Sequence, residues 1–220
     1  MTNKLNAAYE PNMIEAKIYQ KWEESGYFNP DKLSGLKELR TKNLELTRKN
    51  KLSSKSLRSK FYNAKPFCIV MPPPNANGAL HVGHALFVTL EDIMIRFQRM
   101  RGKKTLWLPG ADHAGFETQV VFDKKLEKEG KKRSDFSRDE LYQKIWDFTQ
   151  ENKKVMENQL RKLGASCDWS REKFTLDPDI VEKVQDTFIA LYQDGLIYRG
   201  NRIVNWCVKH QTTLSDLEVR

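Results

Sequence analysis

The sequence predicts an α/β fold in which helices join parallel strands. An apolar run at residues 66–71 is typical of a buried strand. Residues 82–100 then have the spacing of an amphipathic helix, and residues 104–108 look like a second short strand. Such a strand–helix–strand succession is a βαβ unit, which is expected to be parallel and right-handed. The predicted helix has one apolar face, made of Leu86, Leu90, Ile93, Met94 and Phe97.

An amphipathic helix is predicted ahead of this unit, at residues 11–26. Its apolar positions, Ile14, Ile18 and Trp22, recur every four residues. Gly26 is a typical stop signal for a helix.

A basic tract follows at residues 31–62. It holds ten Lys and Arg against three Asp and Glu, which is most of the net charge of +9. Such a tract can attract RNA phosphates, or it can be a solvated insertion. Aromatic residues appear only at Phe61 and Tyr62, so base stacking is not indicated.

Two later helices are indicated by the signals at their ends. One starts at a capping box formed by Ser137 and Glu140 and stops at Gly164. The other opens at Pro178, where proline is tolerated in the first turn, and stops at Gly195.

The tail at residues 196–206 is predicted to form a β-hairpin around Gly200 and Asn201.

Composition limits the class of protein. The chain has 220 residues with 39% hydrophobic side chains, enough for one good core. No apolar run approaches the roughly 20 residues that a membrane span needs. No secretion signal is indicated at Met1. The three cysteines, few and odd in number, suit a reducing cytoplasm, so a cytoplasmic location is expected.

The most informative segment is residues 72–86, Pro-Pro-Pro-Asn-Ala-Asn-Gly-Ala-Leu-His-Val-Gly-His-Ala-Leu. The prolines stiffen the exit from the strand, and Gly78 is expected to adopt a conformation that larger residues resist. His81 and His84 project from one side of a helical first turn, where the helix end is positive. Imidazoles there suit the oxygens of a polyphosphate. Half of a metal site and two ordinary surface histidines are the alternatives for so short a motif.

With its flanking residues, this segment resembles the HIGH region of class I aminoacyl-tRNA synthetases, with Val82 in the variable second position. Residues 107–115 resemble the Pro-Gly-x-Asp-His-Ala-Gly block of valyl-tRNA synthetases. The resemblance covers nearly everything outside residues 31–62. Three later segments also fit it: residues 163–172, 195–200 and 204–207.

The sequence departs from the valyl pattern in two places. Ala76-Asn77 stands where Val-Thr is common and looks more like the isoleucyl version, and Ala111 stands where Thr is usual. An isoleucyl-type enzyme is therefore the alternative. Residues 51–56 look like KMSKS, the second signature of the class, but carry an extra Ser and precede the His motif. We interpret the likeness as a chance result of the amino-acid composition of this segment.

The resemblance implies a Rossmann-like class I synthetase catalytic domain, of which this chain is the N-terminal half, with parallel strands, flanking helices and an N-terminal helix. Residues 1–30 are then the N-terminal helical segment, 31–62 a basic insertion or linker, and 63–220 half of the catalytic domain, ending near the entry to an editing domain. A fragment of this kind is expected to be inactive alone. A non-catalytic RNA-binding remnant and a free-standing nucleotidyltransferase are the competing hypotheses.

The resemblance also implies roles for individual residues in activating an amino acid with ATP. His81 and His84 would act as the catalytic pair, holding the ATP phosphates, and Gly83 would underlie the adenine. Asp112 would pair with the substrate ammonium, and His113 would orient the loop without contacting the substrate itself. The implied ATP-binding residues are Asn77, Gly78, His81, Gly83 and His84. The implied amino-acid-binding residues are Pro73, Pro74, Asn75 and Asp112.

The implied partners are valine, tRNA and ATP with Mg²⁺ as substrate, with no tightly bound cofactor and no membrane. Family members are usually monomeric. Cys207 and His210 have the spacing of half a zinc knuckle, but two ligands are not a site, so no tightly bound zinc is expected.

Overall fold

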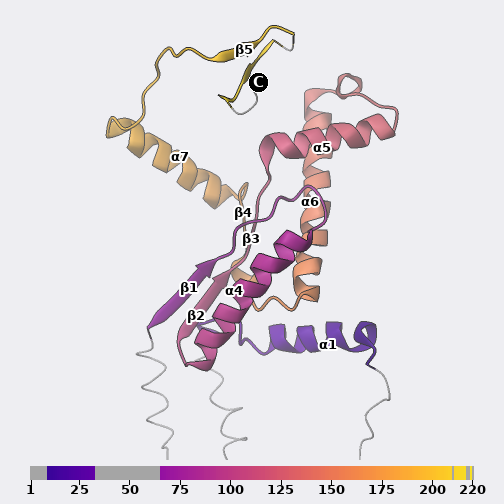
Figure 1. Cartoon of the computed structure of the whole chain (residues 1–220), viewed down its shortest axis with the longest axis vertical. Helices are drawn as coiled ribbons and strands as arrows, with labels where there is room; N and C mark the ends of the chain where they lie inside the picture. The colour runs from indigo at the N-terminus through magenta and orange to yellow at the C-terminus, as the bar shows by residue number, and fades with distance from the viewer. Residues whose placement is uncertain (1–8, 33–64, 210, 217–218, 220) are drawn as a thin grey trace, which may run out of the picture. The chain divides into compact units, whose positions relative to one another are not determined.

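The computed structural model describes residues 9–32, 65–209, 211–216 and 219 (Figure 1). The chain divides into two compact units, Met1–Asp177 and Pro178–Arg220. Nearly all of the predicted basic tract, and the KMSKS-like residues 51–56, lie outside the described residues. The elements of the first unit, in chain order, are α1 (Pro11–Glu24), β1 (Pro66–Val70), α4 (Val82–Met100), β2 (Lys104–Leu108), β3 (Gly110–Ala111), α5 (Gly115–Lys128), η3 (Arg133–Asp135), α6 (Arg138–Lys162), η4 (Trp169–Arg171) and β4 (Lys173–Phe174).

The predicted βαβ unit is present. β1 pairs in parallel with β2, with Cys68 opposite Leu106, and α4 connects the two strands (Figure 1). A second, very short parallel pair follows, in which β3 lies beside β4. Parallel strands place their carboxyl ends at one edge, so the loops that leave β1 and β2 emerge together.

The core lies between α4, the β1–β2 pair and the end of α6. Its buried members are Met71, Val88, Ile95, Trp107, Leu160, Ala165 and Cys167. The face of α4 predicted to be apolar points elsewhere: its five residues are 46% to 63% exposed. The helix has a second, narrower apolar stripe, Val88 and Ile95, and that stripe contacts the strands.

Polar contacts fix the rotation of α4 about its own axis. Asp92 accepts hydrogen bonds from the backbone N–H and the hydroxyl of Ser166, at 3.0 and 2.5 Å. Arg99 donates to the carbonyl oxygen of Ser166 at 2.6 Å, and burial lowers the pKa of its guanidinium to about 10. The indole of Trp107 donates to Glu91 at 2.9 Å, while burial raises the pKa of that carboxyl. The middle and the C-terminal part of α4 are therefore held against β2 and the segment that follows α6.

α1 packs against the rest of its unit mainly through Tyr19, and less through the apolar stripe predicted from the sequence. The hydroxyl of Tyr19 donates to the carbonyl oxygen of Ala165 at 2.7 Å and accepts from the indole of Trp169 at 2.7 Å. Tyr19 is buried, and burial raises the pKa of its hydroxyl. Trp22, in the predicted stripe, stays 40% exposed and lies under the guanidinium of Arg96.

α5 and α6 form a helical hairpin, of which only α6 was predicted. The capping box of α6 is confirmed, since Glu140 accepts from the backbone N–H of Ser137 at 2.9 Å and Ser137 accepts from that of Glu140 at 3.3 Å. The two helices meet at Phe122 and Phe148, whose rings pack edge to face with centroids 5.5 Å apart.

The second unit contains α7 (Pro178–Gln193), β5 (Asn205–Cys207) and β6 (Thr212–Leu214). β5 and β6 pair antiparallel, with Trp206 opposite Thr213. The hairpin predicted around Gly200 and Asn201 is therefore wrong. The apolar residues Ile203, Val204 and Trp206 indicate a strand here, but they do not decide at which end of that strand the turn lies.

Candidate functional site

Two loops meet beyond the carboxyl ends of β1 and β2. The backbone N–H of Asp112 donates to the carbonyl oxygen of Pro74 at 2.9 Å, and that of Ala76 donates to the carbonyl oxygen of Asp112 at 2.8 Å. Ala76 is fully buried against Ala111. The two loops therefore run side by side, and Asn75 faces Asp112 across an isolated parallel bridge.

The first loop carries several residues predicted to bind substrate. Pro73 and Asn75 are exposed, whereas Pro74 is buried and serves the backbone pairing. Asn77 and Gly78 lie half-buried in the turn that follows. Gly78 has no positive φ, and an added Cβ would meet nothing within 4 Å, so the expectation that its backbone excludes larger residues is wrong.

The far end of this loop is tied to α6. The backbone N–H of Leu80 donates to the side-chain oxygen of Gln159 at 2.8 Å. Gln159 was not singled out from the sequence. A polar residue that lies between positions as buried as Met156 and Leu160 could have indicated a hydrogen bond to another segment. The bond fixes the chain just before the two histidines.

His81 and His84 cap α4 reciprocally. His81 is the N-cap residue, and its Nδ1 accepts from the backbone N–H of Gly83 at 3.1 Å. The Nδ1 of His84 accepts from the backbone N–H of His81 at 3.2 Å, and the ring centroids are 4.0 Å apart. An accepting Nδ1 carries no proton, so each neutral ring carries its hydrogen on Nε2.

The charge state of this pair follows from its surroundings. Burial, and to a lesser extent the neighbouring His81, lower the pKa of His84. A neutral His84 keeps its cap intact, because protonation at Nδ1 would remove the acceptor. The pair therefore presents Nε2–H donors at the positive end of a 19-residue helix, an arrangement suited to anionic oxygens.

Gly83 is required by the cap itself. A Cβ at this position would lie 2.9 Å from Cε1 and 3.0 Å from Nδ1 of His81. The His81 ring is therefore the physical reason that a larger residue is disfavoured here. The role predicted for Gly83 beneath a flat ligand stays a prediction.

Asp112 and His113 are held together by a residue that sequence reasoning missed. The Oδ1 of Asp112 accepts from the backbone N–H of Ala114 at 3.0 Å and from the hydroxyl of Thr175 at 3.2 Å. The backbone N–H of His113 donates to the Thr175 hydroxyl oxygen at 2.9 Å, and its Nδ1 lies 2.6 Å from the same oxygen. Thr175 is 63 residues from Asp112, and no local pattern connects them.

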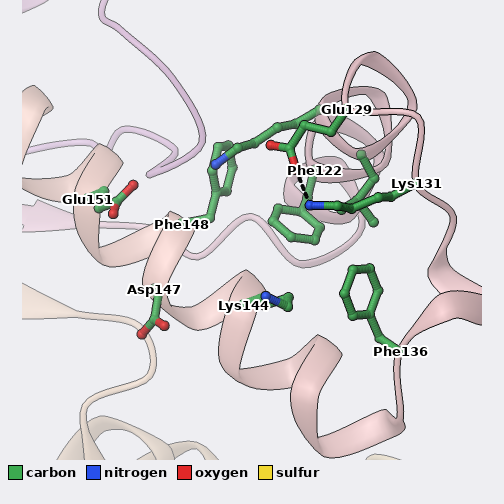
Figure 2. A pocket seen from close by; sticks show the side chains of 10 residues that line it. Phe122, Glu129, Lys131, Phe136, Lys144, Asp147, Phe148 and Glu151 are labelled. Carbon is green, nitrogen blue, oxygen red and sulfur yellow. Dashed lines mark hydrogen bonds and ion pairs between the residues drawn. The ribbon is translucent and has the colours of Figure 1, made fainter.

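The hollow between α5 and α6, about 150 Å³, is not this site (Figure 2). Aromatic rings and charged side chains line it, and Figure 2 shows Lys131 paired with Glu129 at 3.2 Å. Lys144 lies over the ring of Phe136, 5.2 Å from its centroid. None of the predicted site residues lines this hollow, which we interpret as loose packing within the hairpin.

Two sequence expectations concern metals and membranes. Among the described residues, no group of three or more His, Cys, Asp or Glu side chains is placed to hold a metal ion. His210, which with Cys207 has the spacing of half a zinc knuckle, lies outside the described residues, whereas Cys207 ends β5. No helix within the described ranges has the length and apolarity needed to cross a bilayer. The three cysteines all lie in the described part of the chain, and none is in a disulfide.

Comparison with known proteins adds independent findings. A family model described as tRNA synthetases class I (I, L, M and V) matches residues 44–220. The chain is 47% identical over 212 residues to a valine-tRNA ligase of Dehalococcoides mccartyi, covering 96% of this chain and 21% of that protein. It is 46% identical over 205 residues to valine-tRNA ligase, chloroplastic/mitochondrial 2, of Arabidopsis thaliana, covering 93% and 18%.

A solved structure agrees with the fold. The ternary complex of Agrobacterium radiobacter K84 agnB2 LeuRS with tRNA and LeuAMS superposes with a TM-score of 0.66 at 25% identity, covering 97% of this chain and 22% of that chain. The α/β fold class predicted from the sequence is thereby confirmed. The chain spans about a fifth of the length of the curated relatives it matches.

Proposed function

Because this chain belongs to the class I tRNA synthetase family, we propose that its protein activates valine with ATP and transfers it to tRNA. In the first step a carboxylate oxygen of valine attacks the α-phosphorus of ATP. A P–O bond forms to give valyl-adenylate, and the bond to the departing pyrophosphate breaks. No enzyme nucleophile takes part, so the protein contributes positioning and charge stabilisation.

The observation that carries this proposal is the reciprocal cap of His81 and His84. Both Nδ1 atoms accept backbone N–H groups, which leaves both Nε2–H groups to donate. Donors that are already oriented stabilise charge on phosphate oxygens without reorganising during the reaction. In this proposal the Nε2–H groups contact the ATP phosphates, Gly83 lies beneath the adenine, and Asn77 and Gly78 complete the ATP side.

The valine side is assigned to the loops that meet at Asn75 and Asp112. Asp112 pairs with the substrate ammonium, because a carboxylate facing a cation offsets the cost of desolvating both. Asn75 is exposed at the bridge and hydrogen-bonds the amino acid. Pro73 and Pro74 form part of the pocket wall. His113 supports the loop through Thr175.

The remaining partners belong to the same proposal. Mg²⁺ enters with ATP as part of the substrate, and tRNA accepts the activated valine in a cytoplasmic reaction. The LeuRS complex, which contains tRNA and LeuAMS, supports tRNA and an adenylate as ligands of this fold.

The test is amino-acid-dependent exchange of pyrophosphate into ATP, measured with the protein encoded by the complete gene. We expect exchange with valine. An extra methylene in a packed pocket costs about 1–3 kcal/mol, so isoleucine should be about tenfold or more weaker. D112N should raise the KM for valine far more than that for ATP. A preference for isoleucine, which the residues at Ala76 and Asn77 favour, would establish the alternative enzyme. No exchange with any amino acid would contradict the proposal.

A further inference from the structure

We propose that Thr175 is a positioning residue, whose hydroxyl aims the free oxygen of the Asp112 carboxylate at the ammonium group of the amino acid. This inference rests on the proposed function, because it needs Asp112 to face an ammonium. It assigns a role to a residue that touches neither substrate directly.

The short β3–β4 pair is what brings Thr175 into place. Gly110 lies opposite Lys173 and Ala111 opposite Phe174, so the next residue on each strand is Asp112 or Thr175. The backbone N–H of Thr175 donates to the carbonyl oxygen of Ala111 at 3.1 Å, which continues the ladder by one step. Phe174 is buried beside Ala76 and Met156, so β4 cannot shift without opening this part of the core.

Counting protons fixes the direction of each hydrogen bond. A threonine hydroxyl has one proton to donate and two lone pairs to accept with. In this structure the hydroxyl donates that proton to Oδ1 of Asp112, 3.2 Å away. The backbone N–H of His113 occupies one lone pair of the hydroxyl oxygen, at 2.9 Å. Nδ1 of His113, 2.6 Å away, then donates to the other.

The consequence is an asymmetric carboxylate. Oδ1 of Asp112 receives both the Thr175 hydroxyl and the backbone N–H of Ala114, at 3.2 and 3.0 Å. Within the described residues no hydrogen bond is found to Oδ2, so that oxygen is left for the ligand. Ala114 adopts a left-handed φ of 53°, which aims its N–H at the carboxylate. The Asp112 side chain is 36% exposed, so without the Thr175 hydroxyl its carboxylate is held less firmly, by the backbone N–H of Ala114 and by Nδ1 of His113, 3.4 Å from Oδ1.

The experiment compares two adenylate analogues on the protein from the complete gene. One is the sulfamoyl adenylate of valine, and the other is that of isovaleric acid, which differs only in lacking the amino group. Thr175→Val is close in shape to threonine but has no hydroxyl, Thr175→Ala removes both the hydroxyl and the γ-methyl group, and Thr175→Ser keeps the hydroxyl. Dissociation constants are measured by calorimetry, and melting temperatures are recorded for each variant.

We expect T175V and T175A to weaken the valine analogue by about tenfold, the low end for losing a hydrogen bond to a charged group, because the site is partly exposed. Binding of the isovaleryl analogue should change by no more than about twofold, and T175S should behave like wild type. Equal losses for both analogues, no loss for either, or a T175S as weak as T175V would each overturn the inference. If wild type binds neither analogue, the proposed function is wrong and the inference falls with it. If wild type binds and T175V matches it, the inference alone is wrong.

Discussion

Substitutions at His84 can separate its role in capping α4 from its proposed role in binding phosphate, because each role uses a different ring nitrogen. Nδ1 accepts from the backbone N–H of His81 at 3.2 Å, while Nε2–H is the proposed donor to phosphate. Asparagine places an oxygen near the position of Nδ1 and nothing at Nε2. Glutamine reaches the position of Nε2 with an N–H but leaves the backbone N–H of His81 without its acceptor. His84→Asn and His84→Gln should therefore fail in opposite ways.

The expected losses of activity and of stability follow from what each ring nitrogen of His84 contacts. Removing one preorganised donor to developing charge costs about 2.7–4 kcal/mol, or roughly 10²–10³ in kcat. His84 is only half-buried, so H84N should lie near the lower figure, with an unchanged melting temperature. Loss of an N-terminal cap costs about 1 kcal/mol. H84Q should therefore melt lower than wild type while keeping most of its activity.

The assay is valine-dependent pyrophosphate exchange together with thermal melting, on the complete protein, with His84→Ala as the variant that loses both functions. H84N with near wild-type exchange would refute the donor role of Nε2. H84Q melting like wild type would show that the hydrogen bond at Nδ1 contributes nothing to the fold.

Three further outcomes are expected. Gly83→Ala brings a Cβ within 2.9 Å of the His81 ring, so the ring must turn away, and kcat/KM for ATP should fall about tenfold in steady-state exchange without loss of the amino-acid preference. Tyr19→Phe removes a buried hydroxyl that joins Ala165 to Trp169, and should lower the free energy of unfolding in urea by about 1–3 kcal/mol, whereas the exposed Tyr27→Phe should change it by less than about 0.5 kcal/mol. The pKa of His84 is lowered in the fold, so near pH 6.5 the unfolded chain binds more protons than the native one, and stability should fall as the pH drops from about 7 to 5. Melting temperatures across that range should show a smaller fall for H84N; an identical fall would place the titrating group elsewhere.

Local signals in the sequence were enough for much of this fold. The capping box at Ser137 and the strand–helix–strand spacing of the βαβ unit each depend on residues close together in the chain. The parallel pairing of the two strands explains why the two site loops lie at the same edge, where the structure places Asn75 opposite Asp112.

The failures have a common cause in contacts between distant segments. α4 carries two apolar stripes, and only the position of the strands decides that Val88 and Ile95 are buried. β3 and β4 are two residues each, too short for any periodicity, yet their pairing is what delivers Thr175 to Asp112. A sequence pattern reports what one segment prefers, whereas these features depend on which other segment covers it.

The histidine motif has both a local role, in capping α4, and a proposed role in binding a ligand. Ser, Thr, Asn and Asp are the usual N-caps, since an oxygen that accepts a backbone N–H is all that a cap needs. A neutral imidazole is different because its nitrogens lie on opposite sides of a rigid ring, so one can accept from the backbone while the other donates outward. His81 and His84 both use the inward nitrogen in this structure. The outward donors serve no purpose in the cap, which is the physical reason to look for an anion in front of them.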